Sequence, residues 1–263
     1  MRLIWEFLRR SFKRQLVYRA ATIAGLLTNI FFGIIRAAVL IALYGTKSEV
    51  SDLTIQSAIT YAGLTQAMIG FLALFSWYDL MMTIYSGNVA MDLLKPMQYY
   101  YYWLAQDFGR AIGQFLLRGL PLMFLFALLF DITIPNTIIQ WWAIFCALVL
   151  AWLVSFTWRF LANLSAFWSP NSLGIIRFVF IMAWSLSGFF MPLRFYPEWF
   201  QKICFLTPFP YSVNTIVEVY LGKLNGGEIL NALFMQAIWA VGLIILGQLI
   251  LRFGIKRLVI LGG

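Results

Sequence analysis

Residues 20–44 read AATIAGLLTNIFFGIIRAAVLIALY, and this stretch decides the fold. Its one charged residue is Arg36, and the other residues are apolar or weakly polar. A helix of about 20 apolar residues is long enough to cross the hydrocarbon core of a bilayer. The stretch therefore predicts a membrane-spanning helix.

Five further stretches have the same character, at residues 55–77, 111–130, 138–161, 173–191 and 230–251. The whole chain of 263 residues is 62% hydrophobic and 11% charged, whereas soluble domains are roughly 45–50% apolar and about 25% charged. A soluble fold of this size could not cover so much apolar surface. The sequence predicts an all-α integral membrane protein with six transmembrane helices in a single domain over residues 1–263.

Residues 1–19 precede the first predicted span and have the pattern of an amphipathic helix. Ile4, Trp5, Leu8, Phe12 and Leu16 share one side of the helical wheel, and basic residues share the other. Such a helix lies flat in the membrane interface. A signal peptide fits less well, because the basic region is too long and no small-residue cleavage site follows a short apolar core.

The basic residues predict the orientation of the spans. Fourteen of the 19 Lys and Arg lie in the terminal segments, in the connections 78–110 and 162–172, and at the span ends beside them. The other five are Arg36, Lys47, Arg194, Lys202 and Lys223. Basic residues gather on the cytoplasmic side of membrane proteins. Both termini and residues 78–110 are therefore expected in the cytoplasm, and residues 192–228 outside, in a multi-pass protein of the cell membrane.

Three arginines lie within or at the ends of predicted spans: Arg36, Arg118 and Arg159. A charge inside the membrane is costly, so each is a candidate functional residue. Alternatively, each side chain reaches the interface or is paired inside the bundle. This second interpretation is favoured for Arg118 and Arg159, near cytoplasmic span ends, and Arg36 is left open. No acidic residue is expected to be buried at mid-membrane.

The second predicted span carries small residues at short intervals, namely Ala58, Ala62, Gly63, Ala67 and Gly70. Small residues let helices approach one another closely. They predict either a subunit seam or translocation-path wall, or packing against another span of the same subunit.

Several kinds of chemistry are missing from the sequence. It has no GxxxxGK[ST] motif for nucleotide phosphates and no histidine for a catalytic triad or an HExxH zinc site. Cys146 falls within a span and Cys204 in an outer loop, and no Cys cluster has metal-binding spacing. The net charge of +9 follows from the positive-inside rule, so nucleic acid is not expected as a partner.

The loop before the last span reads SLSGFFMPLRFYPEWFQKICFLTPFPYSVNTIVEVYLG, residues 185–222. Prolines divide it into helical segments that are too short to cross the membrane. Such a segment must be buried in protein or lie at the interface, which predicts a re-entrant or interfacial helical hairpin on the outer side.

The order of residues in this loop resembles the last outer loop of the type-2 ABC transporter permeases: Ser187-Gly188, Pro192, Pro197, Trp199, Pro208 and Gly222. The resemblance extends over essentially the whole chain, and it implies a permease with six spans and cytoplasmic termini. It also implies an outer gate, for which the matching residues are Gly188, Pro192, Pro197, Trp199 and Pro208.

In that family, the loop between the second and third spans carries a short coupling helix that docks on the ATPase. The resemblance implies this role for residues 86–96, within the cytoplasmic coupling loop 78–110. Ser86 or Asn88 can cap the helix, and Pro96 can stop it. The candidate coupling residues are Asp92, Leu93, Leu94, Lys95 and Pro96. The following tyrosines, residues 99–102, predict an aromatic anchor at the cytoplasmic interface.

These patterns lead to one functional expectation: the chain is the non-catalytic membrane subunit of an ATP-driven exporter, forming the translocation path. The expected partners are an ATP-binding subunit, a second permease subunit in a homo- or heterodimer, and the lipid bilayer. The chain itself is expected to bind no cofactor, with ATP and Mg on the partner ATPase. A secondary transporter or channel is the first alternative, disfavoured by the absence of titratable mid-membrane pairs and inverted repeats. A membrane enzyme is disfavoured by the absence of histidine.

Overall fold

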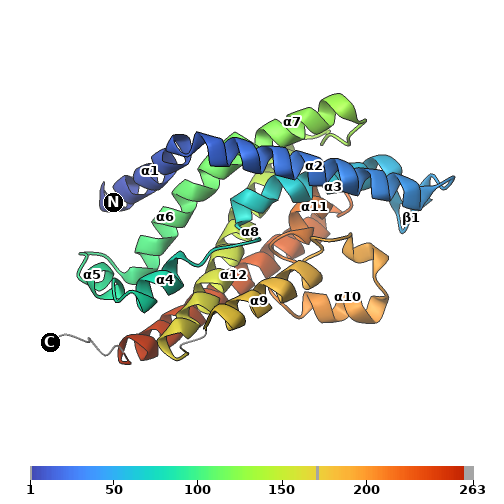
Figure 1. The fold of residues 1–263 in the computed structure, drawn as a ribbon. Coiled ribbons are helices and arrows are strands. Elements are labelled where there is room, and N and C mark those ends of the chain that lie inside the picture. The colour runs from blue at the N-terminus through green and yellow to red at the C-terminus, as the bar shows by residue number, and fades with distance from the viewer. Residues whose placement is uncertain (1, 170–171, 258–263) are drawn as a thin grey trace.

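The computed structural model of the chain describes residues 2–169 and 172–257. They form a helical bundle with a small hairpin at one end (Figure 1). The elements in chain order are α1 (Arg2–Val17), α2 (Arg19–Tyr44), β1 (Glu49–Val50), β2 (Leu53–Thr54), α3 (Ile55–Leu72), α4 (Asp79–Tyr85), α5 (Val89–Leu93), α6 (Tyr99–Gln114), the π-helical turn η1 (Phe115–Gly119), α7 (Leu120–Leu129), α8 (Ile138–Leu164), the 3-10 turn η2 (Ser165–Phe167), α9 (Ser172–Leu186), the 3-10 turn η3 (Leu193–Phe195), α10 (Glu198–Phe205), α11 (Asn214–Tyr220) and α12 (Gly226–Ile255).

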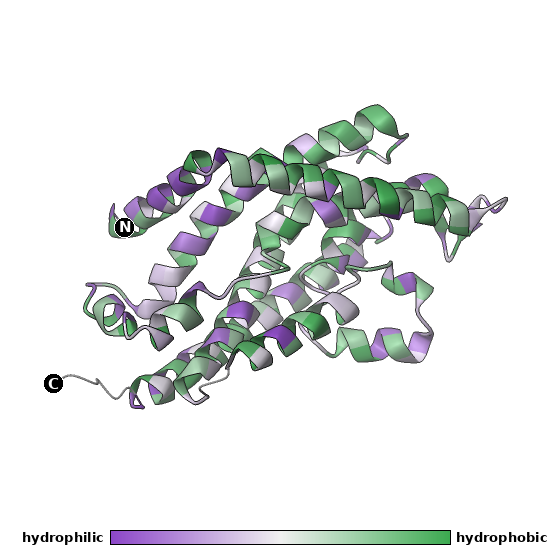
Figure 2. Cartoon of the chain, viewed as in Figure 1, coloured by the Kyte–Doolittle hydropathy of each residue, from purple (hydrophilic) through white to green (hydrophobic). Residues whose placement is uncertain are grey.

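Within the described residues, four helical stretches are long and apolar enough to cross a membrane: Arg19–Tyr44, Tyr99–Leu129, Ile138–Phe167 and Gly226–Ile255. Figure 2 shows apolar residues along α2 and α7 and more polar residues along α1 and α6. The other two predicted spans correspond to shorter helices, α3 with 18 residues and α9 with 15. The prediction of an all-α membrane protein is therefore confirmed at this coarser level.

Helix α3 ends at Leu72 rather than at residue 77, because its last carbonyls are taken by other helices. Ala73 adopts a left-handed conformation, with φ 49° and ψ 51°. Arg110 donates to the carbonyls of Gly70 and Phe71, at 2.5 and 3.1 Å, and Ser155 donates to that of Leu72 at 2.9 Å. These bonds satisfy the carbonyls that a helix end leaves free.

Helix α6 begins at Tyr99, whereas the sequence predicted a span from residue 111, so the connection from α3 to α6 is shorter than the predicted loop 78–110. Helix α6 packs along α1: a side chain at Gly109 would collide with the Leu8 carbonyl, and one at Gly113 would meet Gln15 at 2.7 Å. The polar residues of α6 kept residues 99–110 out of the predicted span, although α6, η1 and α7 together form one of the four long apolar stretches. The π-helical turn η1 precedes Pro121, which has no N–H for the regular helical bond.

The amphipathic helix expected at residues 1–19 is present as α1, and it also packs on α6. Ser11 is buried and donates to the Gln106 carbonyl at 2.6 Å. Ile4, Trp5 and Leu16 remain exposed on the predicted apolar side. The helix therefore offers an apolar surface while being fixed to the bundle by another flank.

The small residues of α3 pack within this chain. A side chain at Gly63 would approach the Phe126 ring of α7 to 2.7 Å, and one at Gly70 would approach Gln114 of α6 to 2.8 Å. Ala58, Ala62 and Ala67 are buried as well. The second of the two interpretations, packing against other spans of the same subunit, accounts for these positions.

The sequence did not predict the antiparallel pair β1–β2, in which Glu49 is opposite Thr54 and Val50 is opposite Leu53. Ser51 and Asp52 turn the chain with φ angles of 48° and 61°. Two successive residues with positive φ are typical of the tight hairpin turn that matches strand twist. The hairpin and α10 lie at one end of the bundle, while the start of α1, helices α4 and α5, and the end of α12 lie at the other (Figure 1).

Candidate functional site

The connection between α3 and α6 contains two short helices, α4 and α5, and only α5 lies within the predicted coupling helix of residues 86–96. Asn163 of α8 holds the entry to α4, because its side chain accepts from the Met81 N–H at 3.1 Å and donates to the Trp77 carbonyl at 3.0 Å. Asn88 precedes α5, and its side chain makes no capping hydrogen bond. The helix ends at Leu93, before Pro96, as expected of a residue that cannot continue a helix.

The two charged residues of this segment face their own chain. Lys95 Nζ lies 2.6 Å from Asp92 Oδ1 and 3.7 Å from the centroid of the Tyr102 ring. Burial disfavours the charge on Lys95, but the hydrogen bonds to Asp92 and Tyr102 outweigh it and raise the Lys95 pKa. Asp92 and Lys95, both among the coupling candidates, are thus paired with each other in the structure.

The remaining coupling candidates divide by exposure. Leu93 is half-buried against the core, whereas Leu94 is 79% exposed and Pro96 is exposed. Met91, which the sequence analysis did not select, is 67% exposed. Met91 and Leu94 are three positions apart on one helical turn and its cap, so they form a small apolar surface that no described residue covers.

The tyrosines that follow are core residues, and the prediction of an interfacial anchor is wrong for three of them. Tyr99, Tyr100 and Tyr102 are 4%, 1% and 9% exposed, whereas Tyr101 is 47% exposed. The Tyr100 hydroxyl lies 3.0 Å from Thr157 Oγ1 of α8. The first turn of α6 therefore inserts its rings between helices, where an amphipathic ring with a satisfied hydroxyl is stable.

The residues of the predicted outer gate do not converge on one point. Gly188 has a φ of 79°, and a side chain there would meet Asn214, Leu193 and Tyr61 at 3.2 Å. Pro192 and Pro197 precede the short helices η3 and α10. The other two gate candidates lie away from the contacts around Gly188. Trp199 is 64% exposed, and Pro208 is half-buried in the turn after α10.

Arg36 connects the first long helix to this outer loop. Its guanidinium donates to Thr65 Oγ1 at 3.0 Å and to the carbonyls of Phe189 and Phe190 at 2.6 and 2.9 Å. It also lies 5.2 Å from the centroid of the Phe189 ring. Of the candidates predicted from the sequence, Arg36 and Gly188 therefore lie close together, because Arg36 bonds the two residues that follow Gly188.

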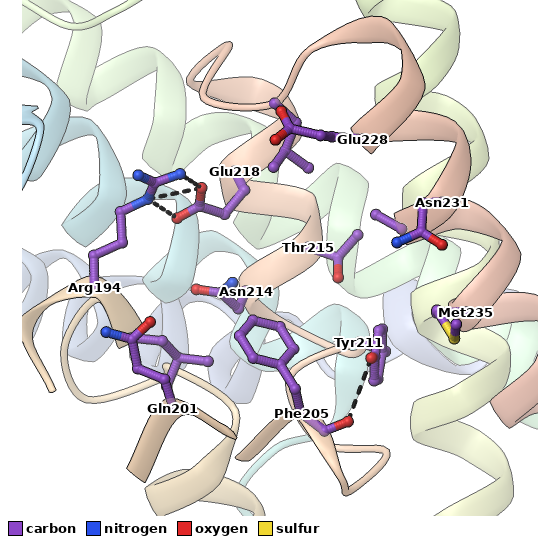
Figure 3. A pocket seen from close by; sticks show the side chains of 13 residues that line it. Arg194, Gln201, Phe205, Tyr211, Asn214, Thr215, Glu218, Glu228, Asn231 and Met235 are labelled. Atoms are coloured by element: carbon purple, nitrogen blue, oxygen red, sulfur yellow. Dashed lines mark hydrogen bonds and ion pairs between the residues drawn. The ribbon is translucent and has the colours of Figure 1, made fainter. Parts of the chain in front are cut away.

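A cavity of about 540 Å³ lies in the outer loop, between α10, α11 and the start of α12 (Figure 3). Arg194 and Glu218 face each other across part of it, with Nη2 to Oε2 at 2.6 Å and Nε to Oε1 at 2.9 Å. The hydrogen bonds and charge of Glu218 raise the Arg194 pKa. Lys223 donates to the carbonyl of Asp52, which ties the β1–β2 hairpin to the same loop. These contacts hold the outer loop as one packed unit.

Sequence reasoning missed a charged cluster between α6 and α8. Asp107 is 2% exposed and accepts from Arg159 Nη2 at 3.0 Å, from Arg110 Nε at 2.9 Å and from Trp152 Nε1 at 2.9 Å. Arg159, itself fully buried, is therefore paired inside the bundle. Asp107 had been expected in the cytoplasmic loop 78–110, but it is a buried residue of α6. One signal in the sequence could have revealed the cluster. Asp107 stands three residues before Arg110, the spacing of an ion pair on one helix face, in a helical pattern that continues from the tyrosines.

Arg118 lies in η1 and has one hydrogen bond to protein in the described residues, from Nη1 to Gln114 Oε1 at 2.9 Å. It faces α2, where a side chain at Gly25 would occupy the position of the guanidinium. Arg118 and Arg36 are therefore both directed toward the region between α2 and its neighbours, but they meet different groups there.

Comparison with known proteins adds one finding. Residues 28–262 match the family model described as ABC-2 family transporter protein. No curated protein matches the chain at a significant level.

Proposed function

Since the chain belongs to the ABC-2 family of transporter proteins, we propose that it is the permease subunit of an ATP-driven exporter. In this proposal it forms the translocation path together with a second permease subunit, and a separate ATPase subunit drives it. The chain itself has no phosphate-binding loop, so ATP and Mg belong to the partner.

The proposed arrangement in the membrane has six crossings: α2, α3, α6 with α7, α8, α9 and α12. The short helices α3 and α9 complete the set of four longer ones, and α10 with α11 forms a hairpin that enters the outer face without crossing. The end of the bundle with the start of α1, α4, α5 and the end of α12 then faces the cytoplasm (Figure 1). The excess of basic residues in these segments supports that orientation.

The observation that carries the proposal is the apolar surface of Met91 and Leu94 at this end. Both side chains are more than half exposed, on a short helix that stands between two membrane-embedded helices. An exposed apolar pair on a helix fixed to the bundle is suited to docking on another subunit. Asn163 of α8 is hydrogen-bonded to the start of α4, which precedes α5 in the chain. A displacement of α5 by a docked subunit would therefore reach the core helices through α4.

The test begins with the chain expressed alone and together with a candidate P-loop ATPase subunit. We expect no nucleotide binding by the chain alone, and ATP hydrolysis and transport only by the complex. Replacing Met91→Ser and Leu94→Ser together should reduce co-purification of the ATPase at least about tenfold, the effect of losing roughly 1.4 kcal/mol of docking energy.

The matched control is Leu206→Ser, which alters a side chain that is 77% exposed in the outer loop. It should leave co-purification unchanged. ATP binding by the isolated chain, or equal co-purification by the Met91/Leu94 variant and wild type, would contradict the proposal. Transport that persists without any ATPase would favour a secondary transporter or channel instead.

A further inference from the structure

Two adjoining cavities lie beside α2 and α3, with volumes of about 450 and 360 Å³; Phe189 and Phe190 also bound the first, and α6 and η1 also bound the second. Asn29, Ile69 and Phe75 line both of them. We refer to the two cavities together as the α2–α3 groove. Arg36 lines one end and Arg118 the other, about three helical turns apart along α2, a rise of about 16 Å.

The wall of the groove near Arg36 is aromatic. Phe32, Phe75 and Phe190 are 52%, 46% and 53% exposed, and each lines this cavity. Rings presented in this way offer contact area to an apolar or aromatic molecular body.

The polar ends of the groove carry positive charge and no carboxylate. No Asp or Glu is among the described residues that line either cavity. Arg110 pairs with Asp107 at 2.9 Å, a carboxylate that it shares with Arg159, and its other donors bond the Gly70 and Phe71 carbonyls. Arg36 and Arg118 form no ion pair with a carboxylate in the described part of the chain.

The two unpaired arginines differ in how much hydrogen-bonding capacity they have left. Arg36 is committed to the Phe189 and Phe190 carbonyls and to Thr65. Arg118 donates to Gln114 alone, and its buried Nε finds no acceptor among the described residues. A guanidinium has five N–H donors in a planar fork that matches carboxylate and phosphate oxygens.

Neighbouring residues hold Arg118 in this position. Gln114 accepts from Arg118 and itself donates to Gln15 Oε1 of α1 at 2.7 Å. On the other side, Gly25 leaves the space that the guanidinium fills, because a side chain there would overlap it. Arg118 of η1 is therefore positioned by residues of three other elements, α1, α2 and α6.

A second polar group in the groove also lacks a partner. Gln66 is 3% exposed, and its Oε1 has no hydrogen bond within the described residues. It lines the same cavity as Arg36. An amide oxygen only accepts hydrogen bonds, so this atom requires a donor such as an ordered water and does not itself recognise an anion.

We infer that the α2–α3 groove binds an amphipathic organic anion, whose charged end pairs with Arg118 while its apolar body lies along the Phe32, Phe75 and Phe190 rings. This inference rests on the proposed function, in which that anion is the cargo. An unpaired charge within a membrane protein is unfavourable, and an anion at Arg118 would offset it with charge-assisted hydrogen bonds.

The test measures binding of 11-(dansylamino)undecanoic acid to the full chain in phosphatidylcholine nanodiscs, by fluorescence, with empty nanodiscs subtracted. The uncharged methyl ester of the same compound is the paired probe. We expect saturable binding of the acid, with an apparent Kd at least about tenfold lower than that of the ester. This comparison needs no variant. Absence of saturable binding, or equal affinity for acid and ester, would overturn the inference.

Variants then locate the anion site. Arg118→Gln should raise the Kd for the acid at least about tenfold, and Gly25→Ala should raise it too by displacing the guanidinium. Arg118→Lys should retain part of the affinity. Arg177→Gln is the control, because Arg177 is an exposed arginine of α9 outside the groove, and it should change nothing. Unchanged binding by a folded Arg118→Gln protein would rule out the assignment.

One further arm separates a soluble cargo from a membrane lipid. Adding phosphatidylglycerol to the nanodiscs at one fifth of the lipid should leave the Kd of the acid unchanged if the groove selects a single-chain anion. Complete competition in the wild type would assign the groove to a lipid headgroup and overturn the cargo assignment. Partner-dependent ATP hydrolysis is measured separately. Failure of probe binding would therefore contradict only the anion site, and failure of ATP hydrolysis would contradict only the proposed function.

Discussion

Asp107 of α6 and Arg159 of α8 form an ion pair in which both side chains are inaccessible to solvent, with Nη2 and Oδ2 3.0 Å apart. The pair joins two long helices whose sequence positions are far apart. Asp107 also accepts a hydrogen bond from Arg110, whose other donors bond the Gly70 and Phe71 carbonyls at the end of α3. One carboxylate thereby fixes the relative positions of three helices.

Replacing Asp107→Asn should destabilise the protein by about 3–5 kcal/mol, because Arg159 would remain buried without its counter-charge. The measurement is the thermal midpoint of the detergent-solubilised protein, followed by size-exclusion fluorescence. Glu6→Gln is the matched control, since the Glu6–Arg10 pair of α1 is largely exposed and should contribute less than about 1 kcal/mol. A shift for Asp107→Asn no larger than that of Glu6→Gln would show that the buried pair does not hold the bundle.

Gly188→Ala should destabilise the outer loop by at least about 1–2 kcal/mol, because Gly188 has a positive φ and a side chain there would press on Asn214, Leu193 and Tyr61. Gly242→Ala is the matched control within α12, where an added methyl group meets nothing within 4 Å. That change should be neutral or stabilise the helix by up to about 1 kcal/mol. Thermal midpoints of the two variants should therefore move in opposite directions, and a Gly188→Ala protein as stable as Gly242→Ala would contradict the account.

Tyr100→Phe should cost about 1 kcal/mol, because it removes the buried hydroxyl that faces Thr157. Tyr101→Phe should cause no measurable loss of stability, because the Tyr101 side chain is exposed. The same thermal assay distinguishes them. Equal effects of the two changes would mean that the tyrosines act as an interfacial belt, as the sequence had suggested.

The cysteines offer a test of the proposed orientation. Cys204 is fully buried, and burial raises the pKa of its thiol, so the folded protein should react slowly with a membrane-impermeant maleimide. The sequence places Cys204 in the outer loop, and labelling there requires an exposed side chain, which the structure does not provide. Cys146 is exposed on α8 and is first replaced by Ser to remove its background. Lys47→Cys should then be labelled in intact cells or spheroplasts, and Leu94→Cys only after permeabilisation. Labelling of Leu94→Cys from outside would overturn the six-crossing arrangement.

Much of the architecture could be predicted from local sequence. The apolar stretch at residues 20–44 became α2, and the amphipathic pattern before it became α1. Pro96 ended the short helix α5 as expected. These features depend on the composition and periodicity of neighbouring residues, which hydropathy and helical spacing report directly.

Long-range pairing decided what the sequence could not show. Asp107 looked like a loop residue because polar and charged residues surround it in the sequence, and its burial depends on Arg159 of another helix. Asp92 and Lys95 looked available to a partner, but they bind each other and the Tyr102 ring. Tyr99, Tyr100 and Tyr102 looked interfacial, but α8 and α1 cover them. The sequence by itself determined that this is a helical membrane protein, because apolarity is a property of each segment. The tertiary structure alone decided which polar side chains are buried, because a polar group is stable inside only when a distant residue supplies its partner.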